Sequence, residues 1–268
     1  MVSSQNQLGV TVLGSGSKGN AVLVHCGGEA ILIDAGFSLK ETRRRMAEAG
    51  MPEDMLRAIV VTHEHDDHVR GLRVCANYYD VPIYATRRCA DVLRRRDDKL
   101  GQLALFAAGS SFSISRFVLE PFSIPHDAND PVGFVIRCGE RKIGIATDMG
   151  HANAMVKYQL RACDTLVVES NHDMNLLAAS TRPWSLKQRI MGRHGHLSNE
   201  ASRDLLTEVV AENTRNIILA HMSEECNRLD LVERCAHDCL ESMQRPDIAM
   251  HVAYQDRPIA TAWVECRP

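Results

Sequence analysis

The feature that most constrains this chain is a group of potential metal ligands that directly follows an apolar segment. Residues 58–62 are apolar and rich in β-branched side chains, which predicts a buried strand. His63, His65, Asp67 and His68 come immediately after it. Imidazole nitrogens and carboxylate oxygens are ligands for zinc and similar ions. On an irregular loop these side chains can converge on metal, so the sequence predicts a metal site; a solvated polar loop is the alternative.

Three further potential ligands each follow another apolar run. They are His126 after the predicted strand 118–124, Asp148 after 142–147, and His221 after 217–220. Loops at the ends of neighbouring strands gather into one site, which favours placing these residues beside the first cluster. The alternatives are a turn histidine at His126, a helix cap at Asp148 and a satisfied core histidine at His221.

The order of apolar runs and turn signals predicts an α/β fold. The predicted strands are 8–13, 21–26, 30–33, 58–62, 118–124, 132–138, 142–147, 165–168, 217–220, 248–253 and 259–264, and the predicted helices are 39–49, 199–212 and 229–243. Each half supplies strands and then helices, and no linker separates them. We therefore expect one domain, residues 1–268, with two mixed sheets packed face to face and helices on both outer faces.

Composition narrows the cellular setting. The nine cysteines form no Cys-x-x-Cys pair in a chain of 268 residues, which favours a reducing cytoplasm over a disulfide framework. The first residues show no signal-peptide pattern, and no apolar run is long enough for a membrane span. The net charge of −3 gives no overall basic signature, so nucleic-acid binding would rest on a local positive surface or on metals.

Two arginine runs, 43–45 and 94–96, are the local basic segments. Counterion release makes such clusters effective on phosphates. Three adjacent residues on a helix point in different directions, however, and acidic residues 97–98 follow the second run. A solvated helix face is therefore preferred to a nucleic-acid patch for both.

The order His-x-His-x-Asp-His at 63–68, followed by His126, Asp148 and His221, resembles the signature of the metallo-β-lactamase superfamily. The resemblance implies a four-layer αββα sandwich that holds two divalent metal ions. It assigns three groups of ligands: His63, His65 and His126 to the first ion; Asp67, His68 and His221 to the second; and Asp148 as the bridge. Zinc, manganese and iron all suit such a site. Glu64, Asp66 and Asp127 are candidate carboxylates for holding the imidazoles, with solvated positions as the alternative.

The segment 195–201, Gly-His-Leu-Ser-Asn-Glu-Ala, resembles the Gly-His-Ser-Thr segment of RNase Z-like phosphodiesterases. In those enzymes the histidine faces the scissile phosphate, so the resemblance assigns His196 to the substrate and to protonation of the leaving oxygen. His196 also precedes the predicted helix 199–212, whose free N–H groups suit a phosphate. A helix-capping segment with an exposed histidine is the alternative.

Several segments between residues 13 and 227 together resemble the YycJ/WalJ group. They are 14–20, 62–68, 125–134, 169–173, 195–199 and 220–227. The group is associated with DNA exonuclease or related phosphodiesterase activity in bacteria, so the resemblance implies nucleic acid, and DNA in particular, as the substrate. The glycine run 14–19 lacks the Gly-Lys-Ser/Thr ending of a P-loop and is interpreted as a tight turn near the site.

These observations together predict a two-metal phosphodiesterase in which a metal-activated hydroxide attacks the phosphodiester. The predicted catalytic residues are Asp67, Asp148 and His196. The predicted substrate contacts are His196, Ser198, His172 and Asn171, of which the last two lie in a polar segment that follows a strand. A metal-dependent thioester or lactam hydrolase is the alternative function on the same fold.

Overall fold

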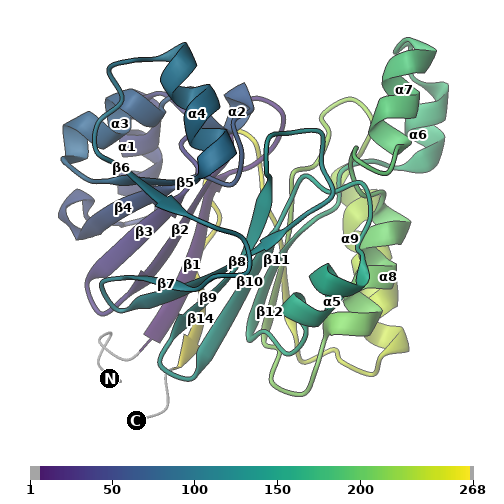
Figure 1. The fold of residues 1–268 in the computed structure, drawn as a ribbon. Coiled ribbons are helices and arrows are strands. Elements are labelled where there is room, and N and C mark those ends of the chain that lie inside the picture. The colour runs from purple at the N-terminus through teal and green to yellow at the C-terminus, as the bar shows by residue number, and fades with distance from the viewer. Residues whose placement is uncertain (1–6, 266–268) are drawn as a thin grey trace.

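The computed structural model describes residues 7–265, which form two seven-stranded sheets packed face to face with helices on both outer faces (Figure 1). Residues 1–6, the start of the segment interpreted above as lacking a signal peptide, and Cys266 lie outside the described residues. The architecture is the four-layer αββα sandwich, so the predicted fold class is confirmed.

The first sheet has the strand order β14-β1-β2-β3-β4-β5-β6. These strands are β1 Gln7–Gly14, β2 Ala21–Cys26, β3 Glu29–Ile33, β4 Leu56–Val60, β5 Ile83–Thr86, β6 Leu103–Phe106 and β14 Ala262–Glu265. Pairing is antiparallel from β14 to β3 and parallel from β3 to β6. Its outer face is covered by α1 Leu39–Glu48, α3 Leu72–Tyr79 and α4 Arg87–Arg96.

The second sheet has the order β13-β12-β11-β10-β9-β8-β7 and is also mixed. Its strands are β7 Phe112–Ile114, β8 Phe117–Ser123, β9 Val132–Cys138, β10 Arg141–Ala146, β11 Thr165–Glu169, β12 Asn216–Ala220 and β13 Ala249–Val252. Pairing is antiparallel from β7 to β10 and parallel from β10 to β13. Helices α5 Ala154–Leu160, α8 Asn199–Val209 and α9 Leu229–Ser242 pack on its outer face.

Apolar side chains fill the space between the two sheets. Strands β2 and β9 are buried along nearly their whole length, because both faces of each sheet are covered. The inner cluster joins both sheets, with Val24 and Ile31 from the first and Phe134 and Ile145 from the second. The rigid sheets therefore fix the positions of the loops that leave their strand ends.

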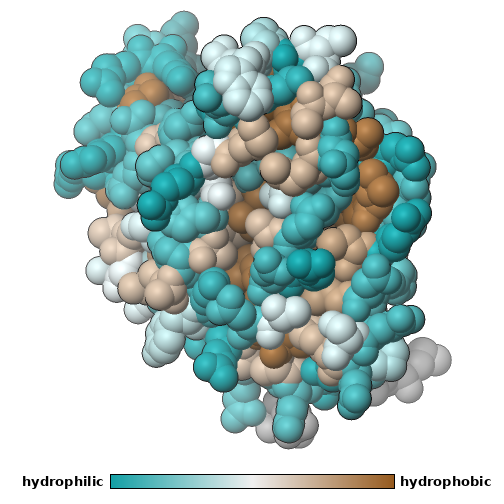
Figure 2. Space-filling model, turned by 90° about the vertical axis from the view of Figure 1, so that its right-hand side faces the viewer, coloured by the Kyte–Doolittle hydropathy of each residue, from teal (hydrophilic) through white to brown (hydrophobic). Residues whose placement is uncertain are grey.

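Two short helices lie apart from these layers. Helices α6 Met174–Ala179 and α7 Trp184–Met191 follow β11 and project as an arm at the upper right of Figure 1. A short helix α2, Asp66–Val69, begins within the histidine cluster, and a single 3-10 turn, η2 Glu53–Met55, precedes β4. Figure 2 shows the side of the molecule on which α5, α8 and α9 lie. Hydrophilic side chains cover much of this face, with apolar areas between them.

Most strands predicted from apolar runs are present with nearly the expected bounds. The helix expected to extend to residue 212 ends at Val209, because Val210 takes an extended conformation. The strand expected from residue 259 begins at Ala262. The sequence did not indicate β5, β6 or β7, which are only three or four residues long, or α2 and α3. For α4 it placed only the arginine run 94–96 on a helix.

Two sequence expectations concern cysteines and membrane spans. No disulfide joins any two of the eight cysteines that the structure describes between residues 7 and 265. In the same part of the chain, no helix combines the length and the apolar character needed to cross a bilayer.

Candidate metal centre

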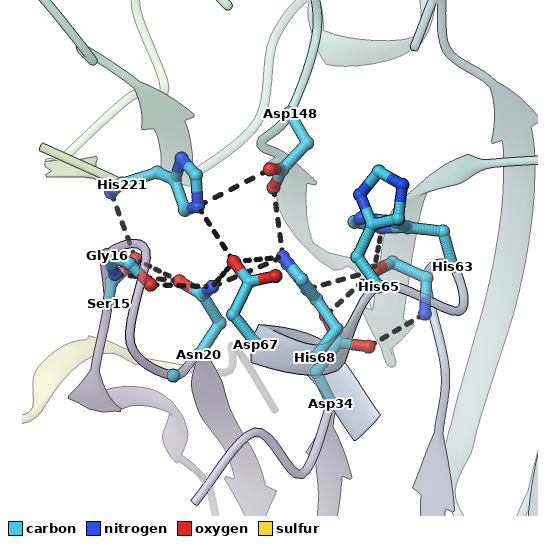
Figure 3. Close-up of polar contacts among 12 residues, drawn as sticks. Ser15, Gly16, Asn20, Asp34, His63, His65, Asp67, His68, Asp148 and His221 are labelled. Carbon is cyan, nitrogen blue, oxygen red and sulfur yellow. Dashed lines mark hydrogen bonds and ion pairs between the residues drawn. The ribbon is translucent and has the colours of Figure 1, made fainter. Parts of the chain in front are cut away.

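Seven potential ligands lie at one end of the sandwich, in loops that leave the strands. His63 follows β4, His126 lies between β8 and β9, Asp148 follows β10, and His221 follows β12. Their ligand atoms form two groups, His63–His65–His126 and Asp67–His68–Asp148–His221, within each of which the atoms lie within 4.8 Å of one another. Figure 3 shows the carboxylates of Asp67 and Asp148 pointing toward the imidazoles of His68 and His221. The structure thus brings together all seven side chains predicted as ligands.

The first group consists of imidazoles alone. The ring centroids of His63 and His65 are 4.6 Å apart, and the His126 ring lies 5.0 Å from each. His126 Nε2 lies 3.3 Å from His65 Nδ1. His63 Nε2 is buried and has no hydrogen-bond partner. A buried nitrogen without a partner is costly, and a cation held by the three imidazoles would satisfy it.

The second group mixes carboxylates with imidazoles. Asp67 Oδ2 lies 3.4 Å from both His68 Nε2 and His221 Nε2. Asp148 reaches the same two nitrogens, with Oδ1 3.3 Å from His221 Nε2 and Oδ2 3.4 Å from His68 Nε2. Asp148 Oδ2 is buried and has no hydrogen-bond partner, although it lies 3.4 Å from His68 Nε2. Asp148 therefore belongs to the second group and keeps one oxygen without a hydrogen bond.

Backbone conformation at this end of the sheets is unusual. Asp148 and His221 have positive φ angles of 59° and 57°, in the left-handed region that non-glycine residues rarely adopt. Such conformations cluster at functional sites, where the surrounding structure compensates their cost. Asp148 lies two residues after β10 and His221 directly follows β12, so both conformations occur where the chain leaves a strand of the second sheet for the site.

The two groups differ in protonation. Burial lowers the pKa of His63 well below its usual value and also lowers the pKa of His126, so both imidazoles are neutral and can offer a lone pair. Burial has the same effect on His221, but Asp148 and other carboxylates outweigh it and raise its pKa to about 10. The pKa of His68 is raised well above its usual value for the same reason. Both upward shifts of pKa arise from the carboxylates that face these two imidazoles, Asp148 foremost.

Two buried carboxylates that the sequence did not single out hold the imidazoles in place. Asp34, directly after β3, accepts a hydrogen bond from His68 Nδ1 at 2.7 Å and from the backbone and hydroxyl of Thr62 at 2.8 Å. Glu169, the last residue of β11, contacts His221 Nδ1 at 3.1 Å and His196 Nδ1 at 2.6 Å. A carboxylate on one ring nitrogen directs the other nitrogen toward the site. Their position at strand ends is the signal that could have identified them.

The three carboxylates proposed from the sequence for this role are placed differently. Glu64 accepts hydrogen bonds from Asn129 instead of an imidazole. Asp66 is 83% exposed and pairs with Arg96 at 3.3 Å. Asp127 alone approaches a site histidine, with Oδ1 3.5 Å from His126 Nε2. Glu64 and Asp66 thus do not hold the imidazoles, because Asn129 engages the first carboxylate and Arg96 the second.

The glycine-rich turn after β1 supports the second group. Ser15 Oγ accepts a hydrogen bond from the backbone N–H of His221 at 2.9 Å, and Asn20 Nδ2 donates to Asp67 Oδ2 at 3.1 Å. Gly16 has a φ of 148° and lies so close to Gln255 that an added Cβ would be 2.6 Å from its Oε1. The run is therefore a tight turn that positions ligands, as expected.

A cavity of about 490 Å³ opens beside the two groups. Its lining includes His65, Asp67, His126, Asp148 and His221 together with Asn171 and His196, two of the predicted substrate contacts. The other two, His172 and Ser198, do not line it. His172 is 1% exposed, and Ser198 caps α8 by accepting a hydrogen bond from the Ala201 N–H at 3.2 Å. The two residues form an isolated β-bridge with each other, where the segments after β11 and before α8 meet.

His196 enters the cavity next to the second group. Its Nδ1 lies 2.6 Å from Glu169 Oε1 and 3.9 Å from Asp148 Oδ1. Burial opposes the charged imidazolium, but Glu169 prevails and raises the pKa of His196. The pKa of Glu169 is lowered to about 2, since the charge of His196 outweighs the effect of burial. His196 can therefore carry a proton at the cavity surface.

Comparison with known proteins identifies the family. A family model described as a beta-lactamase superfamily domain matches residues 29–222. The chain belongs to the beta-lactamase superfamily. As such it is a metal-dependent hydrolase, and its His and Asp groups are able to hold metal ions. The resemblance stated from the sequence is confirmed.

Within the superfamily, the chain is similar to two exodeoxyribonucleases. Exodeoxyribonuclease YycJ of Bacillus anthracis is 33% identical over 233 residues, which cover 86% of this chain and 88% of that protein. Exodeoxyribonuclease WalJ of Streptococcus pneumoniae is 30% identical over 226 residues, with coverages of 82% and 84%. The YhfI protein of Bacillus subtilis, a metallo-beta-lactamase fold protein, superposes with a TM-score of 0.70 at 14% identity and covers 95% of this chain and 99% of its own. The last likeness shows the fold alone.

The arginine runs of this superfamily member do not line the cavity. Arg43 and Arg44 pair with acidic side chains on and near α1, and Arg45 is buried, where it donates to backbone carbonyls. Arg96 donates to the Glu64 carbonyl at 2.6 Å. The arginines engaged in these contacts thus have structural partners instead of lining the cavity. Buried Arg45 differs from the solvated helix face that was preferred for its run, and Arg96 contacts the ligand loop itself.

Proposed function

We propose that this member of the beta-lactamase superfamily is a two-metal phosphodiesterase that degrades nucleic acid, and DNA from an end in particular. The observation that carries the proposal is His196, held by Glu169 on the cavity surface 3.9 Å from Asp148. An imidazolium beside a metal group suits a leaving oxygen that needs a proton, as in phosphodiester cleavage. The names of the YycJ and WalJ relatives support DNA as the polymer.

The proposed ligands divide between two ions. His63, His65 and His126 would hold the first ion; Asp67, His68 and His221 would hold the second, and Asp148 would contact both. The buried, unpartnered His63 Nε2 and Asp148 Oδ2 fit this arrangement. Zinc, manganese and iron all suit this donor set. Divalent ions in such a site polarise the phosphoryl oxygen and lower the pKa of water to about 7.

The chain's own residues would do the remaining work. His196 would donate the proton from its ring to the leaving oxygen, while Glu169 keeps that ring charged and oriented. Asn171 lines the cavity, and its amide donates to the His221 carbonyl at 2.8 Å, which holds it beside the substrate. We place no direct substrate contact on His172 or Ser198. All these elements belong to the single hydrolase domain, residues 1–268, that we propose.

Digestion of end-labelled DNA tests the function. Purified protein supplied with Mn²⁺ or Zn²⁺ is expected to shorten a 5′-phosphorylated oligonucleotide stepwise, and Asp148→Ala and His68→Ala are expected to abolish this. His196→Ala is expected to slow cleavage by about 100-fold or more while metal content persists, since general acid catalysis contributes about that factor. DNA that stays intact with a metal-loaded wild-type protein, alongside hydrolysis of a thioester or lactam, would refute the proposal.

A further inference from the structure

The α6–α7 arm closes one side of the cavity, and its residues have no part in the metal groups. Arg182, Leu186, Arg189 and Ile190 all line the cavity. Three of them recur at the spacing of one helix face, so a single side of α7 is turned to the substrate space. Among the described residues, Arg182 and Arg189 are the two arginine or lysine side chains that line it.

The two helices of the arm are tied to each other, and the arm packs on the body of the protein through a small apolar cluster. Lys187 is buried, and its Nζ donates at 2.6 Å to the carbonyls of Ala178 and Ser180, which ties α7 to the end of α6. Ile190 packs with Leu177 and Cys226 in a small apolar cluster beneath the arm. Two arginines carried on this support are held at defined positions over the cavity.

Each arginine rests on a carboxylate from one of the ligand loops. Arg189 Nε donates to Asp127 Oδ2 at 2.6 Å, and Asp127 directly follows His126. Arg182 Nε donates to Glu225 Oε2 at 3.0 Å, in the loop that follows His221. The arm therefore reaches the ligand loops of both metal groups.

Both guanidinium groups have N–H donors that make no hydrogen bond within the protein. Within residues 7–265, each makes its side-chain hydrogen bond through Nε, and none of their terminal nitrogens has a hydrogen-bond partner. Arg182 is 24% exposed and Arg189 is 61% exposed, so the terminal nitrogens can be reached from the cavity. The free edge formed by the two terminal nitrogens of a planar guanidinium binds a phosphate in bidentate fashion.

We infer that Arg182 and Arg189 form a phosphate subsite for the nucleotides next to the scissile bond, with Leu186 and Ile190 as the apolar surface between them. The inference rests on the proposed nuclease function and refines it. The phosphate that is cut would bind at the ions held by the two groups of ligands. The arm binds neighbouring phosphates of the same single strand. The site thereby prefers a polynucleotide to a small phosphodiester that has one phosphate.

The test compares binding and cleavage on substrates with one phosphate or many. Arg182→Ala and Arg189→Ala are expected to weaken binding of a fluorescent single-stranded oligonucleotide by about tenfold each, the worth of a charge-assisted hydrogen bond, with metal chelated so that nothing is cut. The dependence of log K on log salt concentration should become shallower by about 0.7 for each phosphate that a variant no longer neutralises. With metal present, kcat/KM should fall about tenfold more on the oligonucleotide than on bis(4-nitrophenyl) phosphate.

Three comparison variants make the result specific. Arg189→Lys should recover part of the affinity that Arg189→Ala removes, because it keeps the charge without the bidentate geometry. Arg234→Ala, on α9 with a 67% exposed side chain, should bind like the wild type. Glu225→Gln should bind the oligonucleotide more tightly, since it releases Arg182 and removes a negative charge from the cavity.

Two outcomes would overturn the subsite. One is wild-type binding and substrate preference in both arginine-to-alanine variants. The other is a loss in Glu225→Gln as large as that in Arg182→Ala, which would mean that the ion pair only holds the arm. Failure of the nuclease function itself would appear in the wild type, as no cleavage of any oligonucleotide, whereas failure of the subsite appears only in the variants.

Discussion

The protein buries histidines in two regions, and the surroundings of the two differ. His63 lies in the metal groups, fully buried, with Nε2 unpartnered and other imidazoles around it. His25 on β2 is 3% exposed, yet its Nε2 lies 3.1 Å from Thr11 Oγ1, and its ring packs edge-on against Trp263 at 4.8 Å. Both are neutral, since burial lowers the pKa of His25 to about 4 and that of His63 well below its usual value.

The contrast shows that burial alone does not mark a binding site. His25 has its hydrogen bond within the protein, and Gly9 leaves room for the ring, since a Cβ there would be 2.5 Å from His25 Cε1. His63 has an unmet lone pair that converges with those of its neighbours. The first histidine serves the fold, and we propose that the second serves the metal.

Truncating each histidine to alanine gives the largest expected contrast. His63→Ala should weaken metal binding by more than about 100-fold, because a direct ligand is removed. Loss of a residue that only hydrogen-bonds to a ligand lowers metal affinity by about 10–100-fold. His25→Ala should retain full metal content but destabilise the fold by about 2 kcal/mol or more through poorer packing. Metal analysis by mass spectrometry and urea unfolding of the chelated proteins provide both measurements. Equal metal loss in the two variants would erase the distinction.

A smaller loss of metal affinity is expected when Asp34, which hydrogen-bonds to the proposed ligand His68, is changed. Asp34→Asn keeps the size of the side chain but cannot accept the His68 Nδ1–H in the same way, so the ring loses its orientation. Metal affinity should fall by about 10–100-fold. Asp66→Asn is the matched control, since that carboxylate is 83% exposed and away from the imidazoles. A chelator-competition titration measures both; an Asp34→Asn protein that binds metal like Asp66→Asn contradicts the role of Asp34.

The sequence indicated the proposed metal ligands but not the two carboxylates that hold their imidazoles, and the reason is physical. His63, His65, Asp67 and His68 are adjacent in the chain, so the local pattern alone indicates their purpose. Asp34 and Glu169 are single acids at strand ends, and only the packing of distant strands places them against imidazoles.

The sequence also did not predict the helices of the α6–α7 arm or the position of its arginines at the cavity, for a similar reason. Helices α6 and α7 are short and give little periodic signal. Arg182 and Arg189 do not form an uninterrupted run like those at 43–45 and 94–96, yet they are the arginines that reach the cavity. Uninterrupted arginine runs were thus a poorer guide than the three-dimensional position of single residues.

The smallest expected effect is a pH dependence of stability that arises from His25. Its pKa of about 4 in the folded protein lies below the value near 6.5 of an unfolded chain, so the unfolded state binds the proton first as pH falls. Stability from this residue is therefore complete above pH 6.5 and declines toward pH 4. Between pH 7.5 and 5.5 the loss should be about 1 kcal/mol.

Urea unfolding of the chelated wild type and of His25→Gln at these two pH values isolates that contribution. Glutamine can still hydrogen-bond Thr11 but does not titrate, so the variant should lose about 1 kcal/mol less than the wild type on acidification. The site histidines titrate equally in both proteins and cancel in the difference. An identical loss in the two proteins would mean that His25 is not held neutral by burial, and the contrast with His63 would then rest on convergence of the ligands alone.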